Sequence, residues 1–392
     1  MTYDCVVVGG GPAGATAATG LARAGHRVLL LDRAGRIKPC GGAIPTRLTR
    51  DFAIPEHLIV GRAAAARMVA PSGRTVDMPV DPGGQDYVGM VDRESFDEWL
   101  RARAALAGAR RVTGNFVRID RDTDGCTLVC YTDARGGTEH RIRARSVIGA
   151  DGARSRVAAD ALAAEPMPCV YAYHEVIRSP ESSPAFDRSR CDVFYQAALS
   201  PDFYAWIFPH GDTASVGVGS ANKGFGLRDA TARLRTATGL DSCETLRREG
   251  APIPLRARRR WDNGRDVLVV GDAAGVVAPA SGEGIYYAMV SALHAADAVA
   301  AFLASGNPKA LRQARKRFMR THGLVFQILQ MMQYFWYRND RRRERFVAMC
   351  ADADVQHLTW HAYRNKRLIY ARPLAYARIF LKDMRHLLQT AA

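Results

Sequence analysis

The apolar and polar positions at the start of the chain predict two buried strands on either side of one helix. Residues 5–8 and 27–32 are short, nearly continuous apolar runs, which are typical of strands buried on both faces of a parallel sheet. Residues 12–24 have helical composition and end at Gly25. A strand, a helix and a second strand within about 30 residues predict a βαβ unit of the Rossmann-like type.

The turn between the first strand and the helix carries a glycine pattern that suits a dinucleotide. Gly9, Gly11 and Gly14 form G-x-G-x-x-G. The first glycine permits the tight turn, the second lets the backbone approach a pyrophosphate, and the third lets the helix pack on the strand. The helix N-terminus, with Ala13 in its first turn, faces the phosphates, and Asp32 at the end of the second strand can accept hydrogen bonds from ribose hydroxyls.

Two later segments also end a predicted strand in a turn. Residues 144–157 predict a strand that runs into a tight turn at Asp151-Gly152. Residues 266–303 predict a strand, a Gly-Asp turn, a loop and a long helix. Asp272 can bind ribityl hydroxyls, or a phosphate through water, and the start of the long helix can stabilise negative charge on a reduced flavin. The candidate residues of that loop are Gly282, Gly284 and Ile285.

The middle of the chain is richer in strand patterns. Residues 67–80, 88–91 and much of 166–255 alternate or run apolar between turn residues. In the stretch FYAWIFP, Tyr204, Trp206 and Phe208 fall on one face of a strand, because alternate side chains point the same way. Such a row is either a wall of the core or a lining for a hydrophobic substrate, and the pattern leaves both interpretations open.

Charge is concentrated at the C-terminal end. The net charge is +16, but residues 308–392 carry 18 basic and 5 acidic residues, whereas the other 307 residues carry 37 and 34. A basic tail suits nucleic acid, an anionic membrane surface or an anionic substrate. No nucleic-acid-reading module is evident, so we expect no nucleic-acid partner.

The cysteines and the apolar runs indicate a cytoplasmic protein. The eight cysteines include no C-x-x-C pair and no zinc-ligand spacing, which predicts reduced thiols and no metal site. No uninterrupted apolar run reaches the ~20 residues of a membrane span. A predicted strand begins almost at Met1, which indicates no signal peptide.

Residues 322–345 predict a helix with a wide apolar face that ends in aromatic residues and arginines. Three interpretations stay open. The helix belongs to the core and has a solvated basic end, or it lies at a membrane surface with its arginines on anionic lipids. Alternatively, the arginines grip the diphosphate of a free substrate.

The three glycine and aspartate segments, taken together and in order, resemble the flavoprotein monooxygenase-like superfamily. This resemblance implies FAD as the tightly held cofactor and a contact to it from Arg93. The alternative is that Arg93 is a solvated arginine in the first turn of its helix. The expected fold is α/β, with a Rossmann-like FAD-binding domain, a strand-rich substrate domain laid over the flavin, and a helical C-terminal tail. The expected boundaries are 1–165 and 256–305 for the FAD-binding domain, 166–255 with strands from 66–91 for the substrate domain, and 306–392 for the tail.

Further motifs narrow the resemblance to the geranylgeranyl reductase family. These are Cys40-Gly41-Gly42, the FYAWIFP strand, and Gly282-Glu283-Gly284-Ile285. The stretches DRAGRIKPCGGAIP and GMVDRESFDEWL, with the basic tail, resemble the chlorophyll and bacteriochlorophyll branch along the whole chain. The resemblance implies saturation of isolated C=C bonds of a geranylgeranyl chain to phytyl, by a hydride from reduced flavin plus a proton, with NADPH as the transient reductant.

The same resemblance sets expectations for substrate and location. The chain to be reduced belongs to bacteriochlorophyll or to geranylgeranyl diphosphate, and Tyr204, Trp206 and Phe208 would line its path. The protein would be peripheral on the cytoplasmic face of the photosynthetic membrane, with a bacteriochlorophyll synthase as a neighbour. Two rivals remain: a flavin-dependent aromatic hydroxylase of the same fold, and a non-catalytic pigment carrier.

The resemblance places Cys40 and Gly41 at the flavin, but two roles for the thiol compete, and a redox disulfide is a third alternative, although no cysteine lies nearby in sequence. Cys40 is either a proton donor or relay to the alkene, or a small side chain in a turn that brings backbone near the isoalloxazine. Glu283 beside the flavin is either a second proton relay or a solvated, structural carboxylate.

Overall fold

The computed structural model divides into two compact units that each combine segments distant in sequence. Unit 1 comprises Met1–Cys40, Arg93–Cys169 and Pro252–Gln330, and unit 2 comprises Gly41–Asp92, Val170–Ala251 and Met331–Ala392. The structure describes residues 1–33, 37–81, 83–84, 86–133, 137–181, 183 and 186–366. Residues 367–392 of the predicted helical tail therefore lie outside the described residues.

Unit 1 is built on a largely parallel sheet. Its apolar strands pair in parallel, with Val6 beside Leu29 on one side and beside Val147 on the other. These strands are buried on both faces, as their continuous apolar runs predict. One antiparallel strand, β9, joins the outer parts of β8 and β10. The strands are β1 (Thr2–Val8), β2 (Val28–Asp32), β8 (Arg110–Arg121), β9 (Thr127–Asp133), β10 (Glu139–Gly149) and β16 (Val267–Val269).

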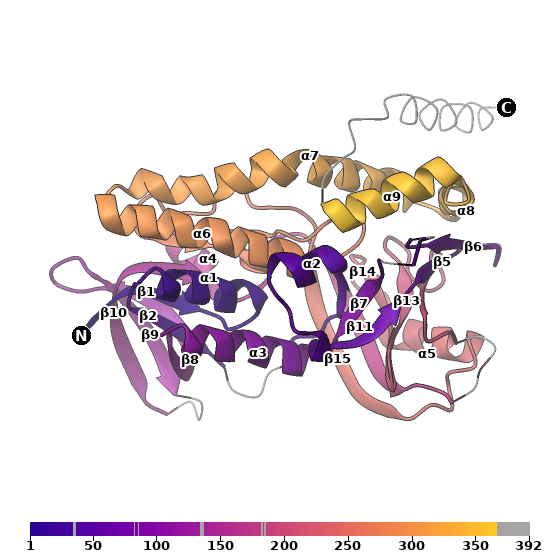
Figure 1. Ribbon diagram of the computed structural model, residues 1–392, viewed down its shortest axis with the longest axis horizontal. Helices are drawn as coiled ribbons and strands as arrows, with labels where there is room; N and C mark the ends of the chain where they lie inside the picture. Colours follow the sequence, from indigo (N-terminus) through magenta and orange to yellow (C-terminus); the bar gives the residue numbers. More distant parts are fainter. Residues whose placement is uncertain are drawn as a thin grey trace. The chain divides into compact units, whose positions relative to one another are not determined.

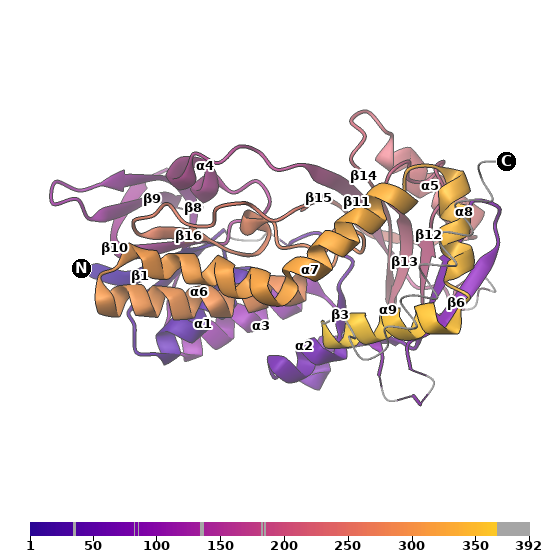
Figure 2. The same cartoon turned by 90° about the horizontal axis from the view of Figure 1, so that it is seen from above.

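Helices cover the sheet of unit 1. Helix α1 (Pro12–Arg23) packs against α3 (Arg93–Leu106) and α6 (Ile285–Ser305), and both views show α1 and α6 side by side (Figures 1 and 2). Small residues allow this approach: a Cβ at Gly20 would lie 3.2 Å from the Cβ of Ala296. Helix α4 (Arg156–Leu162) packs on β8 and β16.

Among the described residues, one helix, α6, is long enough and apolar enough to cross a membrane. Its packing on α1 and its row of buried small residues, which includes Ala288, Ala292 and Ala295, identify it as a core helix of unit 1.

Unit 2 contains a mixed seven-stranded sheet and a smaller three-stranded one. The large sheet has the order β15-β11-β14-β13-β12-β5-β6, and β12 and β5 are its parallel pair. Its strands are β5 (Ala65–Val69), β6 (Thr75–Pro79), β11 (Cys169–Arg178), β12 (Arg190–Phe194), β13 (Ala205–His210), β14 (Thr213–Ser220) and β15 (Thr245–Pro254). The small sheet has the order β3 (Ala43–Pro45), β7 (Val88–Val91) and β4 (Ile59–Ala63).

The two faces of the large sheet differ in character. One face packs its alternate residues, among them Ile207, Val216 and Val218, on α5 (Leu227–Ala237) in an apolar core. The other face carries the aromatic row of β13, because Trp206 and Phe208 alternate with Ile207. Period-two alternation thus separates a structural face from a candidate functional one.

The C-terminal part of the described chain is helical. Helix α7 (Arg312–Trp336) contains residues of both units, and α8 (Asp340–Met349) and α9 (Ala353–Asn365) follow in unit 2. Asn339 and Asp352 accept hydrogen bonds at the first turns of α8 and α9, so each helix begins with a side-chain cap. These elements, with the sheets of both units, confirm the predicted α/β fold class.

Candidate functional site

The glycines of the first loop have distinct structural roles. Gly9 has a φ of +106°, and a Cβ there would lie 2.6 Å from the carbonyl carbon of Ala150. A Cβ at Gly14 would overlap the carbonyl oxygen of Gly9. These two glycines therefore let β1, α1 and the end of β10 meet closely. Gly11 differs, because a Cβ there would meet no described atom within 4 Å.

The open space at Gly11 adjoins the start of α1. Gly11 is the N-cap, and no side chain within the described residues caps this helix. Pro12 has no N–H, so the N–H groups of Ala13 and Gly14 are the first donors of the turn. The N–H donors at the start of α1 are therefore uncapped, and the space beside Gly11 is open. This arrangement fits the pyrophosphate of FAD.

Asp32 lies beside the same loop. It ends β2, and its carboxylate pairs with Nη1 of Arg101 at 3.4 Å. Arg101 also donates to the carbonyl oxygen of Gly10 at 3.3 Å. The predicted ribose acceptor is thus held next to the glycine loop, although its role toward the cofactor stays a prediction.

The second predicted flavin segment packs on the first. The short helix η2 (Gly271–Ala274) begins at Gly271, whose φ is +59°, and a Cβ there would lie 2.8 Å from the Cβ of Ala13. Asp272 follows and forms an ion pair with Nζ of Lys38. A Cβ at Gly284 would lie 3.6 Å from Oδ1 of Asp272. The Gly-Asp turn therefore brings the starts of α1 and α6 into one part of unit 1.

The loop before α6 has the geometry of a turn that presents backbone. Gly282 has a φ of +67°, and its N–H donates to the carbonyl of Ala278 at 2.9 Å. Gly284 is the N-cap of α6, with no side-chain cap from the described residues, and Ile285 begins the helix buried. Glu283 accepts from the N–H of Ala278 through its carbonyl oxygen, at 2.9 Å.

The Glu283 carboxylate also acts on a neighbouring tyrosine. Burial raises the pKa of Tyr287 well above its ordinary value, and the charge of Glu283 raises it further. The proton-relay role of Glu283 stays a prediction.

The Asp-Gly turn after β10 has a structural function. The carboxylate of Asp151 accepts from Oγ of Ser155 at 2.5 Å and from the N–H groups of Arg156 and Val157 at 2.7 and 3.1 Å. It therefore satisfies donors at the start of α4. Burial raises the pKa of this carboxyl group.

Cys40 lies beside a buried arginine. Arg93, at the start of α3, is held by Asp97 one helical turn later through two hydrogen bonds of 2.9 and 2.7 Å. Burial lowers the pKa of Arg93, but the Asp97 carboxylate and the neighbouring Cys40 raise it, and the net shift is upward. The sequence predicted both Arg93 and Cys40 at the flavin, and the structure brings them together within unit 1.

The glycines after Cys40 belong to unit 2 and pack on the aromatic strand. A Cβ at Gly41 would lie 3.0 Å from Cδ2 of Phe208 and 3.8 Å from Nε1 of Trp206. Gly42 has a φ of +68°, and a Cβ there would lie 2.5 Å from Nε2 of His210. The Cys-Gly-Gly turn is therefore glycine-rich because its backbone lies directly on the side chains of β13.

The aromatic row of β13 forms one continuous surface. The ring centroids of Tyr204 and Trp206 are 6.0 Å apart, and those of Trp206 and Phe208 are 6.2 Å apart. The Trp206 ring lies over Gly217 of β14, where a Cβ would overlap it. The predicted common face is confirmed for Trp206 and Phe208, whereas Tyr204 lies one residue before β13. The role of the three residues toward a substrate stays a prediction.

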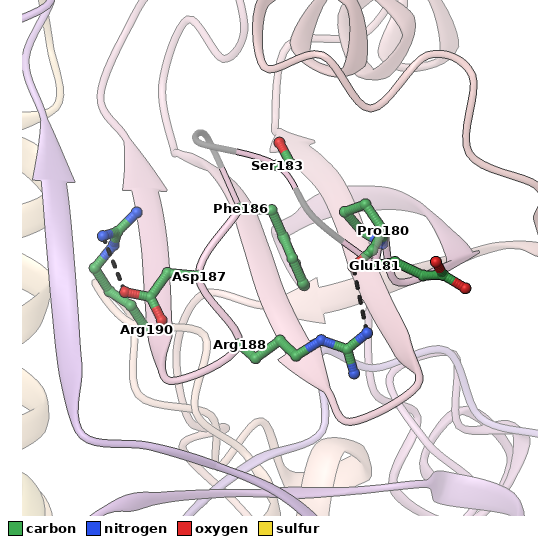
Figure 3. Close-up of a pocket in the computed structure, with 7 residues that line it drawn as sticks. All are labelled: Pro180, Glu181, Ser183, Phe186, Asp187, Arg188 and Arg190. Carbon is green, nitrogen blue, oxygen red and sulfur yellow. Dashed lines mark hydrogen bonds and ion pairs between the residues drawn. The ribbon is translucent and has the colours of Figure 1, made fainter.

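A pocket of unit 2, with a volume of about 700 Å³, is lined by none of the predicted site residues (Figure 3). Its polar groups are engaged locally: Arg190 pairs with Asp187, and Arg188 donates to the carbonyl oxygen of Pro180. The lining residues are Pro180, Glu181, Ser183, Phe186, Asp187, Arg188 and Arg190.

Several residues that the sequence did not single out complete the site of unit 1. Asp97 and Arg101 follow Arg93 by four and eight residues on α3, so helical spacing alone places them on one face. This signal was readable in the sequence. Lys38 is different, because its partner Asp272 is 234 residues away and no local pattern links them.

The fold and the glycine loop define a flavoprotein with an FAD-binding domain. The profile of the FAD-binding domain family matches residues 2–322, which is most of the chain. A structure described as geranylgeranyl bacteriochlorophyll reductase-like, from Thermoplasma acidophilum, has the same fold, with a TM-score of 0.81. It is 21% identical and covers 95% of this chain and 99% of its own.

Curated relatives define the family more closely. The chain is 54% identical to the geranylgeranyl diphosphate reductase of Rhodobacter capsulatus, over 99% of this chain and 98% of the relative. It is 37% identical to the enzyme of the same name from Synechocystis, with the same coverage. The chain belongs to the geranylgeranyl reductase family.

Proposed function

We propose that this protein is an FAD-dependent reductase that saturates the isolated C=C bonds of a geranylgeranyl chain. The observation that carries the proposal is the full-length similarity to the Rhodobacter reductase. The open space at Gly11 beside the uncapped start of α1, called the flavin cradle below, supports the cofactor independently of that similarity. The aromatic face of β13 provides the apolar surface that a prenyl chain requires.

When bound, FAD supplies the hydride chemistry of the reaction. The chain's own residues bind and orient. The N–H groups of the α1 turn bind phosphate, and Asp32 accepts from the ribose. The start of α6 near Asp272 places positive helix-dipole charge in the same part of unit 1. Apolar side chains such as Trp206 and Phe208 exclude water from an alkene that they contact.

We further propose NADPH as the reductant and the free diphosphate as one substrate, with the pigment-bound chain as the other. The names of the curated relatives support the diphosphate. The resemblance of DRAGRIKPCGGAIP to the bacteriochlorophyll branch supports the pigment. Reduction of three double bonds would give the phytyl chain.

An anaerobic single-turnover experiment tests the proposal. The flavin is reduced with NADPH, and then geranylgeranyl diphosphate, or geranylgeranyl-bacteriochlorophyll in detergent, is added. We expect flavin reoxidation with mass gains of two hydrogens per step in the prenyl product. If only one of the two compounds reoxidises the flavin, the enzyme reduces the prenyl chain in that form. Silence with both, followed by oxygen-dependent product formation, would favour the hydroxylase, and pigment binding without reoxidation would favour the carrier.

We also propose that the protein is peripheral on the cytoplasmic face of the photosynthetic membrane, near a bacteriochlorophyll synthase that handles the same prenyl chain. Helix α7 supports this location, because Leu324, Met331 and Tyr334 are large, exposed hydrophobic residues at helical spacing. The guanidinium groups of Arg338 and Arg342 lie over aromatic rings near the end of the same helix. Exposed apolar side chains next to arginines suit an anionic lipid surface.

A further inference from the structure

The aromatic face of the large sheet contains a buried polar cluster. In the strand register, Trp206 lies beside Gly217 and Phe208 lies beside Ser215, while Gly217 lies beside His174 on the next strand. Ser215 and His174 therefore stand on the same face as the aromatic row, rather than on the apolar face that packs against α5. Both side chains are buried, with 3% exposure each.

Specific contacts hold this cluster together. Oγ of Ser215 lies 2.9 Å from Nδ1 of His174 and accepts a hydrogen bond from Nε1 of Trp206 at 3.0 Å. On the other side of the imidazole, Nε2 lies 3.2 Å from Oε2 of Glu249 on β15. This contact is within ion-pair distance, although Nε2 makes no hydrogen bond to a described residue.

A gradient of exposure connects the cluster to solvent. The Glu249 side chain is 13% exposed, and its Oε1 lies 3.3 Å from Nε of Arg247. Arg247 is 32% exposed and pairs at 3.2 Å with Asp92, which is 35% exposed. The groups that face His174 are thus Ser215 from β14, Trp206 and the more distant His210 from β13, and Glu249 with Arg247 from β15.

An imidazole and a carboxylate are unusual groups to find buried behind an apolar surface. Burying such groups costs free energy that packing would not require, since an apolar pair could fill the same space. The nearby His210 does not offer the same chemistry. Its Nδ1 donates to the carbonyl oxygen of Phe208 at 3.0 Å, which fixes one tautomer of a neutral ring. His174 instead lies between a hydroxyl group and a carboxylate.

We propose that Glu249, His174 and Ser215 form a proton relay from the Arg247–Asp92 rim to the aromatic face. The inference rests on the proposed function, because alkene reduction consumes one proton for each hydride. The π bond breaks, one carbon takes the hydride from the reduced cofactor, and the other carbon takes the proton. Imidazolium at His174 passes its Nδ1 proton to the Ser215 hydroxyl, which releases its own proton toward the alkene. The cycle begins with neutral His174 carrying its one proton on Nδ1, and the imidazolium forms when Nε2 takes a second proton from solvent through Glu249. After the transfer the remaining proton is on Nε2, and a turn of the ring restores the starting tautomer.

In this role His174 acts through Ser215 and positions the proton rather than touching the reacting carbon. Ser215 is the inner end of the relay, since it lies beside Phe208 in the register and touches the Trp206 indole. The distances of 2.9 and 3.2 Å on the two sides of the imidazole are short enough for proton transfer after a small reorientation of the ring.

The test uses the full-length protein loaded with FAD, and geranylgeranyl diphosphate as the probe. In anaerobic single turnovers, flavin reduction by NADPH and flavin reoxidation by the prenyl substrate are followed separately, in water and in deuterium oxide, across the neutral pH range. We expect His174→Gln to slow reoxidation roughly 100-fold and to flatten its pH profile. Glu249→Gln and Ser215→Ala should change the profile in the same direction, while the rate of NADPH reduction and the FAD content stay at wild-type values.

His57→Gln is the matched control, because His57 is an exposed histidine of the same unit, and it should leave both half-reactions unchanged. If His174→Gln does not fold, Ser215→Ala decides, since it removes a single hydroxyl group. The relay would be overturned if the wild-type flavin is reoxidised but the variants keep the wild-type pH profile and isotope effect, even if their rates fall. A wild-type protein that is reduced by NADPH but never reoxidised by prenyl substrates would overturn the proposed function, and the relay with it.

Discussion

Gly11 and Gly14 lie three residues apart, at the N-cap and in the first turn of α1, yet they are glycines for different physical reasons. A side chain at Gly14 would overlap the backbone of Gly9, so this position serves the contact between α1 and β1. A side chain at Gly11 would meet no described atom of the chain within 4 Å, so the chain itself gives no packing reason for glycine there. We therefore expect a bound ligand to be the reason for glycine at position 11.

This contrast predicts different outcomes for two matched substitutions. Gly11→Ala should change the free energy of unfolding of the FAD-free protein by no more than about 1 kcal/mol. It should weaken FAD binding by at least about tenfold, because the new methyl group occupies the cradle. Gly14→Ala should instead destabilise the FAD-free protein itself, by about 3 kcal/mol. Urea unfolding and fluorescence titration with FAD measure both effects, and unchanged FAD affinity in Gly11→Ala would contradict the assignment.

His210 makes a separate prediction about acid stability. Burial lowers its pKa from 6.5 to about 4, despite the hydrogen bond to the Phe208 carbonyl. Between these values the unfolded chain binds more protons than the folded one, so stability is lost as pH falls through this window. The free energy of unfolding should fall by up to about 3 kcal/mol from this group.

Urea unfolding at a series of pH values checks this prediction. His210→Asn should flatten the dependence between pH 6.5 and about 4, whereas His57→Asn at an exposed site should not. An identical slope in wild type and His210→Asn would show that other groups cause the acid sensitivity.

At the level of elements, short-range patterns were readable from the sequence and long-range partnerships were not. The period of two correctly placed Trp206 and Phe208 on one face, because strand geometry is local. Which strands flank them depends on the sheet order, and so the approach of His174, from a strand more than 25 residues earlier in sequence order, had no local signal. In the same way, the glycine loop was readable as a cofactor turn, but the Lys38 partner of Asp272 was not.

Helix α3 carries a pair that should matter for stability as well as for the site. Asp97→Asn would leave the Arg93 guanidinium buried without its carboxylate, which should cost about 3–5 kcal/mol in the free energy of unfolding. The double substitution Arg93→Met with Asp97→Leu should recover most of this loss, because it removes both charges. Asp51→Asn breaks an exposed pair of the same i,i+4 spacing and should cost less than about 0.5 kcal/mol. Similar costs for the buried and exposed pairs would contradict this account.

On the scale of the whole molecule, the chain passes between its two units at Cys40–Gly41, Asp92–Arg93, Cys169–Val170, Ala251–Pro252 and within α7. The flavin cradle belongs to unit 1 and the aromatic face to unit 2. Two of the crossings coincide with motifs singled out in the sequence, the Cys-Gly-Gly turn and the start of α3. The residues on the two sides of each of these crossings therefore belong to different units.

The distribution of charge leads to the last prediction, which concerns the membrane. Residues 308–392 carry a balance of +13, and in α7 the side chains of Met331 and Tyr334 are 64% and 72% exposed. If these side chains enter a lipid surface, the FAD-loaded protein should sediment with vesicles that contain phosphatidylglycerol and much less with phosphatidylcholine alone. High salt should weaken this binding, because it screens the attraction of the arginines to anionic headgroups.

The double substitution Met331→Ser with Tyr334→Ser should weaken vesicle binding about tenfold by removing apolar area, with flavin reduction by NADPH unchanged. Leu106→Ser on α3, at 90% exposure, is the matched control and should bind like the wild type. Equal binding to neutral vesicles would remove the electrostatic part of the proposal, and undiminished binding of the double variant would place the contact elsewhere than on α7.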